Sequence, residues 1–212
     1  MIIVNFNIRG MGGNTKAGYL RHLIGREGVD FVCIQETKAK RFSDAKCFSL
    51  WGNNNSGWLH YEGDNGSGSL LSMWHKEAFS YNSHLMGKGF IAVFGTYSKT
   101  NIRCVVVNVY AACNLRYKKI LWEELTNIMS ASQDVVWCLC GDFSAVRSPS
   151  ERKGSTVRGD QSKEIDGFNN FIESNMLLDI PTVGKKYTWF NSNGLAKSRL
   201  DRVLVSEEWL AQ

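Results

Sequence analysis

Three polar side chains in this sequence follow apolar runs that read as strands, and their types are those that bind a metal ion beside a phosphate. Asn7, Glu36 and Asp142 each stand at or just past the end of such a run. Ligand sites of open α/β sheets lie at the carboxyl ends of the strands, so side chains at neighbouring exits would converge. Carboxylate and amide oxygens are hard ligands, which Mg²⁺ binds together with several waters and a phosphate substrate. The pattern indicates a divalent-metal site that acts on a phosphate.

A plainer interpretation is that these residues belong to ordinary turns. Gly141-Asp142 is common turn chemistry, and so short a motif also matches by chance. The glycine-rich stretch after Asn7 has neither the spacing of a dinucleotide fingerprint nor that of a phosphate loop. Taken alone, each residue leaves the turn interpretation open, and the rest of the chain has to decide it.

Buried strands and amphipathic helices must position these residues. Val135–Cys140 is an unbroken apolar run that is too short for a helix, which is typical of a strand buried on both faces. By the same reasoning, strands are expected at Ile2–Phe6, Phe31–Ile34, Ser69–Trp74, Phe90–Tyr97, Arg103–Tyr110, Val135–Cys140, Thr188–Phe190 and Ser198–Val205. Helical spacing predicts helices from Asn14 or Thr15 to Gly28 (apolar Tyr19, Leu20, Leu23, Ile24), from about Leu115 to Met129 (Tyr117, Ile120, Leu121, Leu125, Ile128) and through Ile165, Phe168, Phe171 and Ile172.

Polar stretches between these elements are expected to be surface loops. They are Asn53–Gly57, Glu62–Gly68 and a longer basic segment from Arg147 to Gly159, which we expect to be mobile. The basic segment could contact phosphates, although a solvated loop would have the same composition. Its basic residues are Arg147, Arg152, Lys153 and Arg158.

The composition is that of one globular domain spanning residues 1–212, with 43% hydrophobic and 21% charged residues. A net charge of +5 favours a polyanionic partner, but Lys and Arg form no continuous run, so a solvated basic surface is the alternative. The six cysteines lie mostly in apolar runs and include no Cys-x-x-Cys pair, which indicates buried free thiols in a reducing compartment. Since no signal peptide or membrane-spanning stretch is evident, an intracellular protein without membrane contact is expected.

Five short motifs stand in order along nearly the whole chain, and each is weak alone. They are Asn7-Ile8-Arg9-Gly10, Gln35-Glu36-Thr37-Lys38, Asn108-Val109-Tyr110-Ala111, Gly141-Asp142-Phe143 and Ser198-Arg199-Leu200-Asp201-Arg202. Together they resemble the endonuclease/exonuclease/phosphatase family, which includes deoxyribonuclease-I-like enzymes and apurinic/apyrimidinic endonucleases. Within that family the chain looks most like the endonuclease domain of non-LTR (long interspersed) retrotransposons.

The resemblance implies an α/β (α+β) fold, a four-layer α/β/β/α sandwich of two mixed sheets. It implies that Glu36, helped by Asn7, holds Mg²⁺ (or Mn²⁺) against the scissile phosphate of DNA. Asp142 would position or deprotonate the attacking water, and Tyr110 would donate to a phosphate oxygen. Asp201 would orient the catalytic histidine of the family. Phosphate contacts are expected from Lys38, Arg147, Arg152, Lys153 and Arg158.

The sequence departs from the family pattern in two important places. Ser144 stands where the family has an asparagine that contacts the transition state, and a hydroxyl has a shorter reach than an amide. The final Ser-Asp-His strand is missing, and all four histidines, His22, His60, His75 and His84, lie upstream. Ala112 replaces a common proline, which should matter less. We therefore expect a domain that is truncated at its C-terminus and impaired.

The resemblance further implies a nuclear monomer followed by a reverse-transcriptase domain in the full-length element. Two alternatives remain open. One keeps the fold but acts as a nucleotide or phosphoinositide phosphatase, and the other is a non-catalytic remnant that binds nucleic acid. The basic balance and the motifs favour DNA over lipid, whereas Ser144 and the absent histidine favour the remnant.

Overall fold

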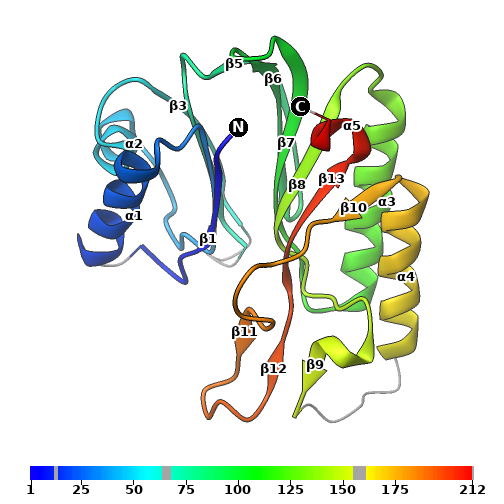
Figure 1. Ribbon diagram of the computed structural model, residues 1–212. Coiled ribbons are helices and arrows are strands. Elements are labelled where there is room, and N and C mark those ends of the chain that lie inside the picture. Colours follow the sequence, from blue (N-terminus) through cyan, green and yellow to red (C-terminus); the bar gives the residue numbers. More distant parts are fainter. Residues whose placement is uncertain (12–13, 64–67, 155–160, 212) are drawn as a thin grey trace.

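The computed structural model describes residues 1–11, 14–63, 68–154 and 161–211, and two β-sheets packed face to face form its centre (Figure 1). The first sheet has the order β1-β2-β4-β3 and the second the order β10-β13-β8-β7-β6-β5. The first consists of β1 (Ile3–Asn7), β2 (Phe31–Gln35), β3 (Ser56–Tyr61) and β4 (Leu70–His75). The second consists of β5 (Phe79–Gly87), β6 (Phe90–Tyr97), β7 (Ile102–Tyr110), β8 (Val136–Asp142), β10 (Leu177–Asp179) and β13 (Asp201–Ser206).

Helices cover the outer face of each sheet (Figure 1). On the first sheet lie α1 (Asn14–Glu27) and α2 (Asp44–Trp51), and on the second lie α3 (Leu115–Ala131) and α4 (Gln161–Ser174). The short α5 (Glu207–Leu210) follows β13. A small third sheet of β11 (Trp189–Phe190), β12 (Lys197–Ser198) and β9 (Arg152–Lys153) extends from the lower end of the molecule in this view.

Three apolar clusters fill the spaces between these layers. One lies between the two sheets, around Phe31 and Val106. A second joins α1 and α2 to the first sheet through Leu20 and Trp51, and a third joins α3 and α4 to the second sheet through Phe168. The expected α/β/β/α sandwich of two mixed sheets is therefore confirmed.

Parallel pairing brings the exits of the chemistry-bearing strands to one edge. In the first sheet β1 runs parallel to β2, with Asn7 opposite Gln35. In the second, β7 runs parallel to β8, with Tyr110 opposite Asp142. Antiparallel β13 places Asp201 on the other side of Asp142. The lower ends of both sheets in Figure 1 consequently carry the residues expected at the site.

Several elements differ from the expectation. The strand Val135–Cys140 continues through Gly141 to Asp142, so these two residues are not a turn. The run Ser198–Val205 is divided into β12 and β13, and Ser56–Tyr61 is a strand where a loop was expected to reach Gly57. No separate element had been expected at α2, β5, β9 or β10.

The basic segment after β8 is not simply a loop. Pro149–Glu151 forms a 3₁₀ helix, and β9 follows it directly. Residues 155–160, which include Arg158, lie outside the described residues.

The apolar faces of two helices are also placed differently from the prediction. Tyr117 and Ile120 of α3 are exposed, whereas Lys118 between them is buried. The helix therefore presents a face that begins with Lys118 and continues through Leu121, Trp122 and Leu125. Tyr19 of α1 is likewise exposed.

In the part of the chain that the structure describes, no helix is long and apolar enough to cross a membrane. All six cysteines are free thiols, and five of them are buried. The exception is Cys113, which is exposed two residues before α3 begins.

Candidate active site

A cleft of about 620 Å³ opens where the strand exits of the two sheets meet. It is lined by Asn7 and Glu36 from the first sheet and by Tyr110 and Asp142 from the second. The Asn7 amide Nδ2 donates to Glu36 Oε1 at 2.9 Å, so this pair is fixed relative to each other. Four residues from separate sequence motifs therefore line one cavity.

Asp201 lies beside this cleft but does not line it. It pairs with Asp142 in register across β13 and β8. Its backbone N–H donates to the hydroxyl of Thr188 at 3.0 Å. Burial raises the pKa of the Asp201 carboxyl above its ordinary value. Tyr110, Asp142 and Asp201 thus occupy equivalent positions on three adjacent strands.

The backbone around the cleft is held in an uncommon conformation. Arg9, Glu36, Lys38 and Ser144 all have φ between 48° and 55°, in the left-handed region that costs roughly 1–2 kcal/mol for an ordinary L residue. Hydrogen bonds sustain it, because Gly10 N–H donates to the carbonyl oxygen of Glu36 at 2.6 Å. Such outliers persist where the surrounding structure over-determines them, and they cluster at functional sites.

Burial dominates the electrostatics of Asp142. It raises the pKa of this carboxyl from 3.8 to about 6, and the negative charges of Asp201 and Glu36 add to the effect. The Ser144 N–H opposes it by donating to Asp142 Oδ1 at 2.8 Å. A carboxylate whose pKa lies near the working pH is suited to general acid–base chemistry.

Tyr110 remains a hydroxyl donor at any physiological pH. Burial raises the pKa of its phenol, and the neighbouring Glu36 carboxylate raises it further. Its hydroxyl can therefore hydrogen-bond to an anion in the cleft.

The donors of Glu36 and Asn7 fit a hard cation that keeps most of its own water. Among the residues that the structure describes, no group of three or more His, Cys, Asp or Glu side chains is arranged to hold a metal ion. Mg²⁺ does not require such a cage, because it is commonly bound through one or two carboxylates, several waters and the phosphates of the substrate. Glu36 and Asn7 are the residues that would hold it here.

The basic residues expected to contact phosphate divide into separate groups. Arg152 lines the cleft, and Lys38 and Lys153 are exposed near it, at the exit of β2 and in β9. Arg147 does not line the cleft; it forms an ion pair with Asp179 at 3.6 Å and donates from Nε to Asn169 at 2.9 Å. Arg147 is thus used within the fold.

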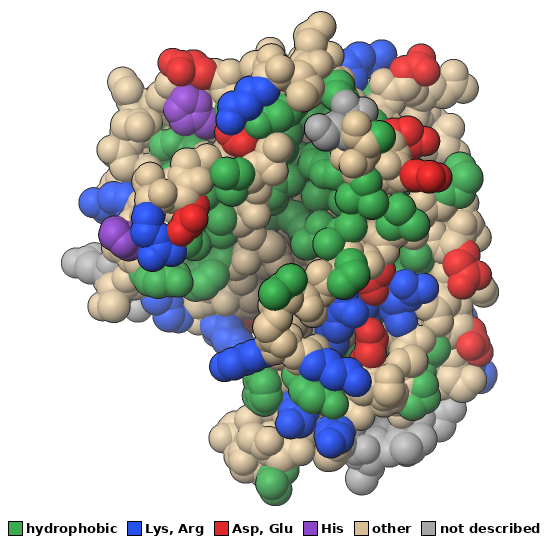
Figure 2. Space-filling model, in the orientation of Figure 1, with side chains coloured by type: hydrophobic (Ala, Val, Ile, Leu, Met, Phe, Trp, Pro, Cys, Tyr) green, Lys and Arg blue, Asp and Glu red, His purple; other side chains and the backbone are tan. Residues whose placement is uncertain are grey.

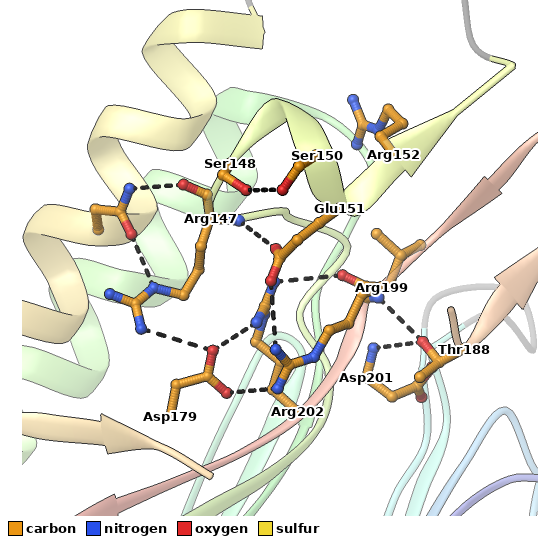
Figure 3. A network of polar contacts seen from close by, with 12 residues as sticks. Arg147, Ser148, Ser150, Glu151, Arg152, Asp179, Thr188, Arg199, Asp201 and Arg202 are labelled. Atoms are coloured by element: carbon orange, nitrogen blue, oxygen red, sulfur yellow. Dashed lines mark hydrogen bonds and ion pairs between the residues drawn. The ribbon is translucent and has the colours of Figure 1, made fainter. Parts of the chain in front are cut away.

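Sequence reasoning missed a buried ion network beside the site (Figure 3). Arg202, fully buried, forms ion pairs with Glu151 and with Asp179, the latter at 2.6 Å. Arg199 joins the same two carboxylates, at 3.3 Å to Glu151 and 2.9 Å to Asp179. The network ties the 3₁₀ helix and β10 to the strand that carries Asp201. The two arginines that flank Asp201 in the motif were a visible signal.

Lys118 also lines the cleft, and sequence reasoning missed it. Its Nζ donates to the Ser144 carbonyl oxygen and to Glu164 Oε2, both at 2.5 Å. The other Glu164 oxygen accepts from Arg152 at 3.4 Å. Lys118 therefore holds the turn after Asp142 in place through the Ser144 carbonyl. Glu164 links Lys118 to Arg152, which lines the cleft. The sequence carries no local signal for this role, because the partners of Lys118 come from α4 and from the turn after β8.

Comparisons with known proteins agree with this geometry. A model of the Endonuclease/Exonuclease/phosphatase family matches residues 4–212. A search of curated proteins gives no match. Among solved structures, the AP endonuclease LMAP from Leishmania major superimposes with a TM-score of 0.75 at 16% identity, over 99% of this chain and 80% of that one.

Other solved structures share the fold at equally low identity. The APE2 catalytic domain of Xenopus laevis gives a TM-score of 0.71 at 16% identity, covering 100% of this chain and 84% of that one. The human Nocturnin catalytic domain with bound sulfate gives 0.68 at 14%, covering 97% and 81%. Enzymes with this fold are generally dependent on divalent metals. Because the family model spans nearly the whole sequence, the chain belongs to the endonuclease/exonuclease/phosphatase family.

Proposed function

We propose that this chain is a Mg²⁺-dependent DNA endonuclease domain of the retrotransposon type, and that it works poorly in its present form. The observation that carries the proposal is the convergence of Asn7, Glu36, Tyr110 and Asp142 in one cleft. Arg152 at that cleft supplies positive charge for a phosphate. Lys and Arg side chains gather on the end of the molecule that bears β9, β11 and β12 (Figure 2), which supports a polyanionic substrate.

Each side chain has a definite task in this proposal. Asp142 accepts a proton from the attacking water, because its raised pKa makes it a serviceable base near neutral pH. Tyr110 donates its hydroxyl to a phosphate oxygen. When bound, the metal ion supplies charge stabilisation for the phosphoryl oxygens. Glu36 and Asn7 hold it, and Lys118 keeps the Ser144 turn in place.

Two features support the impairment. Ser144 offers a short hydroxyl, which lies 3.4 Å from Asp142 Oδ1, where the family pattern has an amide. Among the described residues no histidine lines the cleft, so Asp201 has no imidazole to orient there. Loss of the histidine's general acid–base assistance should lower the rate by about 10²–10⁴-fold. Loss of the amide donor at Ser144 should lower it by about 10²–10³-fold.

A nuclear protein with a reverse-transcriptase domain is the setting that we propose for this domain. β1 is an edge strand, paired on one side with β2. A strand carrying Ser-Asp-His would supply the histidine that the family pattern has. A monomer that binds DNA is the form we propose for the isolated domain.

A plasmid-nicking assay with Mg²⁺ tests the proposal. The unmodified chain should nick at or near background, extension with a Ser-Asp-His strand should restore part of the activity, and Ser144→Asn should restore more. Asp142→Ala in the repaired protein should abolish it again. Strong nicking by the unmodified chain would overturn the impairment, and a fully repaired chain that never nicks DNA would overturn the endonuclease assignment.

A phosphatase of the same fold is the second candidate. It is favoured by the likeness to a mannosyl-6-phosphatase from Bacteroides thetaiotaomicron, with a TM-score of 0.61 at 13% identity. Release of phosphate from nucleotides or phosphoinositides by the repaired chain, without any nicking, would select it. A chain that binds DNA but hydrolyses no phosphate ester after repair would be a non-catalytic remnant.

A further inference from the structure

The candidate site is divided between the two large sheets, whose strands form separate hydrogen-bonded ladders. Asn7 ends β1 and Glu36 follows β2, so the residues that would hold the metal ion belong to the first sheet. Tyr110 and Asp142 end β7 and β8 in the second sheet. Apolar packing between the sheets is non-directional, so it does not fix their relative position as directional bonds do. The spacing of the two halves of the site calls for a further constraint.

Three amide side chains, Asn5, Gln35 and Asn108, form a hydrogen-bonded bridge across the space between the sheets. Gln35 Nε2 donates to Asn5 Oδ1 at 2.6 Å and to Asn108 Oδ1 at 2.7 Å. Asn108 belongs to the second sheet, and its Nδ2 donates to the carbonyl oxygens of Ile34 and Leu71 in the first, at 3.3 and 3.1 Å. Gln35 and Asn108 are fully buried. The amide bridge is therefore a directional cross-link in a region of low dielectric, where hydrogen bonds are strong.

Each amide of the bridge stands one or two residues before a side chain of the site. Asn5 lies two residues before Asn7 in β1, so both project from the same face of the strand. Asn108 and Tyr110 have the same relation in β7. Gln35 ends β2, directly before the carboxylate of the first half. A shift of the bridge would therefore be passed to both halves of the site.

Stability alone does not account for the Gln35 side chain. Its Oε1 is buried and has no hydrogen-bond partner among the residues that the structure describes. A buried acceptor without a partner costs the free energy of its lost hydration, a cost that an apolar side chain does not carry. Polar groups retained in a core at such a cost can select one arrangement of the surrounding elements. Gln35 has the character of a residue that selects a geometry.

We propose that the amide bridge is a positioning device, which fixes the metal-binding half of the site relative to the half that binds the phosphate. None of its three residues lines the cleft, so each acts through the neighbouring residue of the site. This inference rests on the proposed metal-dependent action on DNA and adds the residues that couple its two ligands. Because both halves would act on one phosphate group, Mg²⁺ and DNA should bind cooperatively only while the halves keep their spacing.

The coupling between the two ligands tests the inference. The dissociation constant of a fluorescent DNA duplex is measured by anisotropy in EDTA and in Mg²⁺ at matched ionic strength, and a gel checks that the duplex stays intact. The EDTA-to-Mg²⁺ ratio, divided by the same ratio for Glu36→Gln, is the coupling through the metal ligand. In the wild type it should be about 5- to 150-fold, and Asn108→Leu should reduce it to about one. The Mg²⁺-induced shift in melting temperature should stay as in the wild type, because both metal ligands belong to the first sheet.

Two further variants separate positioning from a loss of stability. Tyr97→Phe removes a hydrogen bond from β6 to Asp30 Oδ2 at the start of β2, 3.2 Å long and far from the cleft, and should keep the wild-type coupling. Asn5→Ala, at a half-buried position, should lower the coupling part of the way and tests the bridge if Asn108→Leu does not fold. An uncoupled wild type, wild-type coupling in the folded bridge variants, or an equal loss in Tyr97→Phe would overturn the positioning role and leave the proposed function standing. A wild type that binds no DNA, or whose melting temperature does not respond to Mg²⁺, would overturn both.

Discussion

Replacement of Asp142 by asparagine should stabilise the fold, and the gain should depend on pH. The carboxyl is only 8% exposed, and burial raises its pKa from 3.8 to about 6. The difference is roughly two pH units, which corresponds to about 3 kcal/mol at 1.36 kcal/mol per unit. The folded state pays this energy to keep the carboxylate ionised.

The direction follows from proton binding. Because the pKa is higher in the folded state, the folded protein binds the Asp142 proton more tightly than the unfolded chain does. The contribution of this group to stability is therefore greatest below about pH 4, falls as the pH rises from about 4 to about 6, and stays low above that. Asparagine keeps an acceptor for the Ser144 N–H and removes the charge. Asp142→Asn should exceed the wild type by up to about 3 kcal/mol at pH 8, and the two should converge near pH 4.

Urea unfolding at a series of pH values measures this difference. Asp134→Asn is the matched control, because Asp134 is exposed and asparagine tolerates its left-handed backbone (φ 56°). Subtracting the wild-type curve from each variant removes the titration of the other carboxylates. A difference that does not change with pH, or a wild type that is the more stable at pH 8, would refute the electrostatic reasoning.

Three further predictions concern metal, DNA and the ion network. Mg²⁺ should raise the melting temperature of the wild type by mass action, and Glu36→Gln should remove most of that shift; equal shifts in both would show that Glu36 is no ligand. DNA binding should weaken with salt, and the double variant Arg152→Gln, Lys153→Gln should have a shallower dependence of log K on log salt concentration, by about 0.9 per lost phosphate contact. Lys99→Gln is the control, because Lys99 lies beside Asp30 at the opposite end of the sandwich and should leave the slope unchanged. Arg202→Met should cost about 3–5 kcal/mol in urea unfolding, since Glu151 and Asp179 would lose their buried partner; a loss below about 1 kcal/mol would contradict a buried, coupled network.

The residues at the strand ends could be predicted because the pattern that identifies them is local in the sequence. An apolar run followed by an acid places Glu36 and Asp142 at the end of a strand without knowledge of the partner strands. The position of Arg147 could not be predicted in the same way. Its partners Asp179 and Asn169 come from β10 and α4, and only the tertiary fold brings them beside the segment after β8.

The face of α3 was assigned incorrectly for a related reason. Tyr117 and Ile120 have the apolar character of a buried stripe, and Lys118 has the character of a surface residue. Burial of the lysine becomes favourable only because Glu164 and the Ser144 carbonyl meet its ammonium group. Apolar periodicity cannot reveal a buried charge whose compensating groups lie in another helix and another turn.

Position 141, in the strand that carries Asp142, should tolerate no residue other than glycine. Its φ is 146°, and a Cβ there would lie 1.9 Å from the carbonyl oxygen of Val109 in the neighbouring strand. A library of all single substitutions should therefore show no graded series at this position: alanine, the smallest replacement, should be as damaging as most larger ones. In a selection for folded variants, glycine should be recovered at this position far more often than any other residue, because it lets β8 hold Asp142 beside Tyr110.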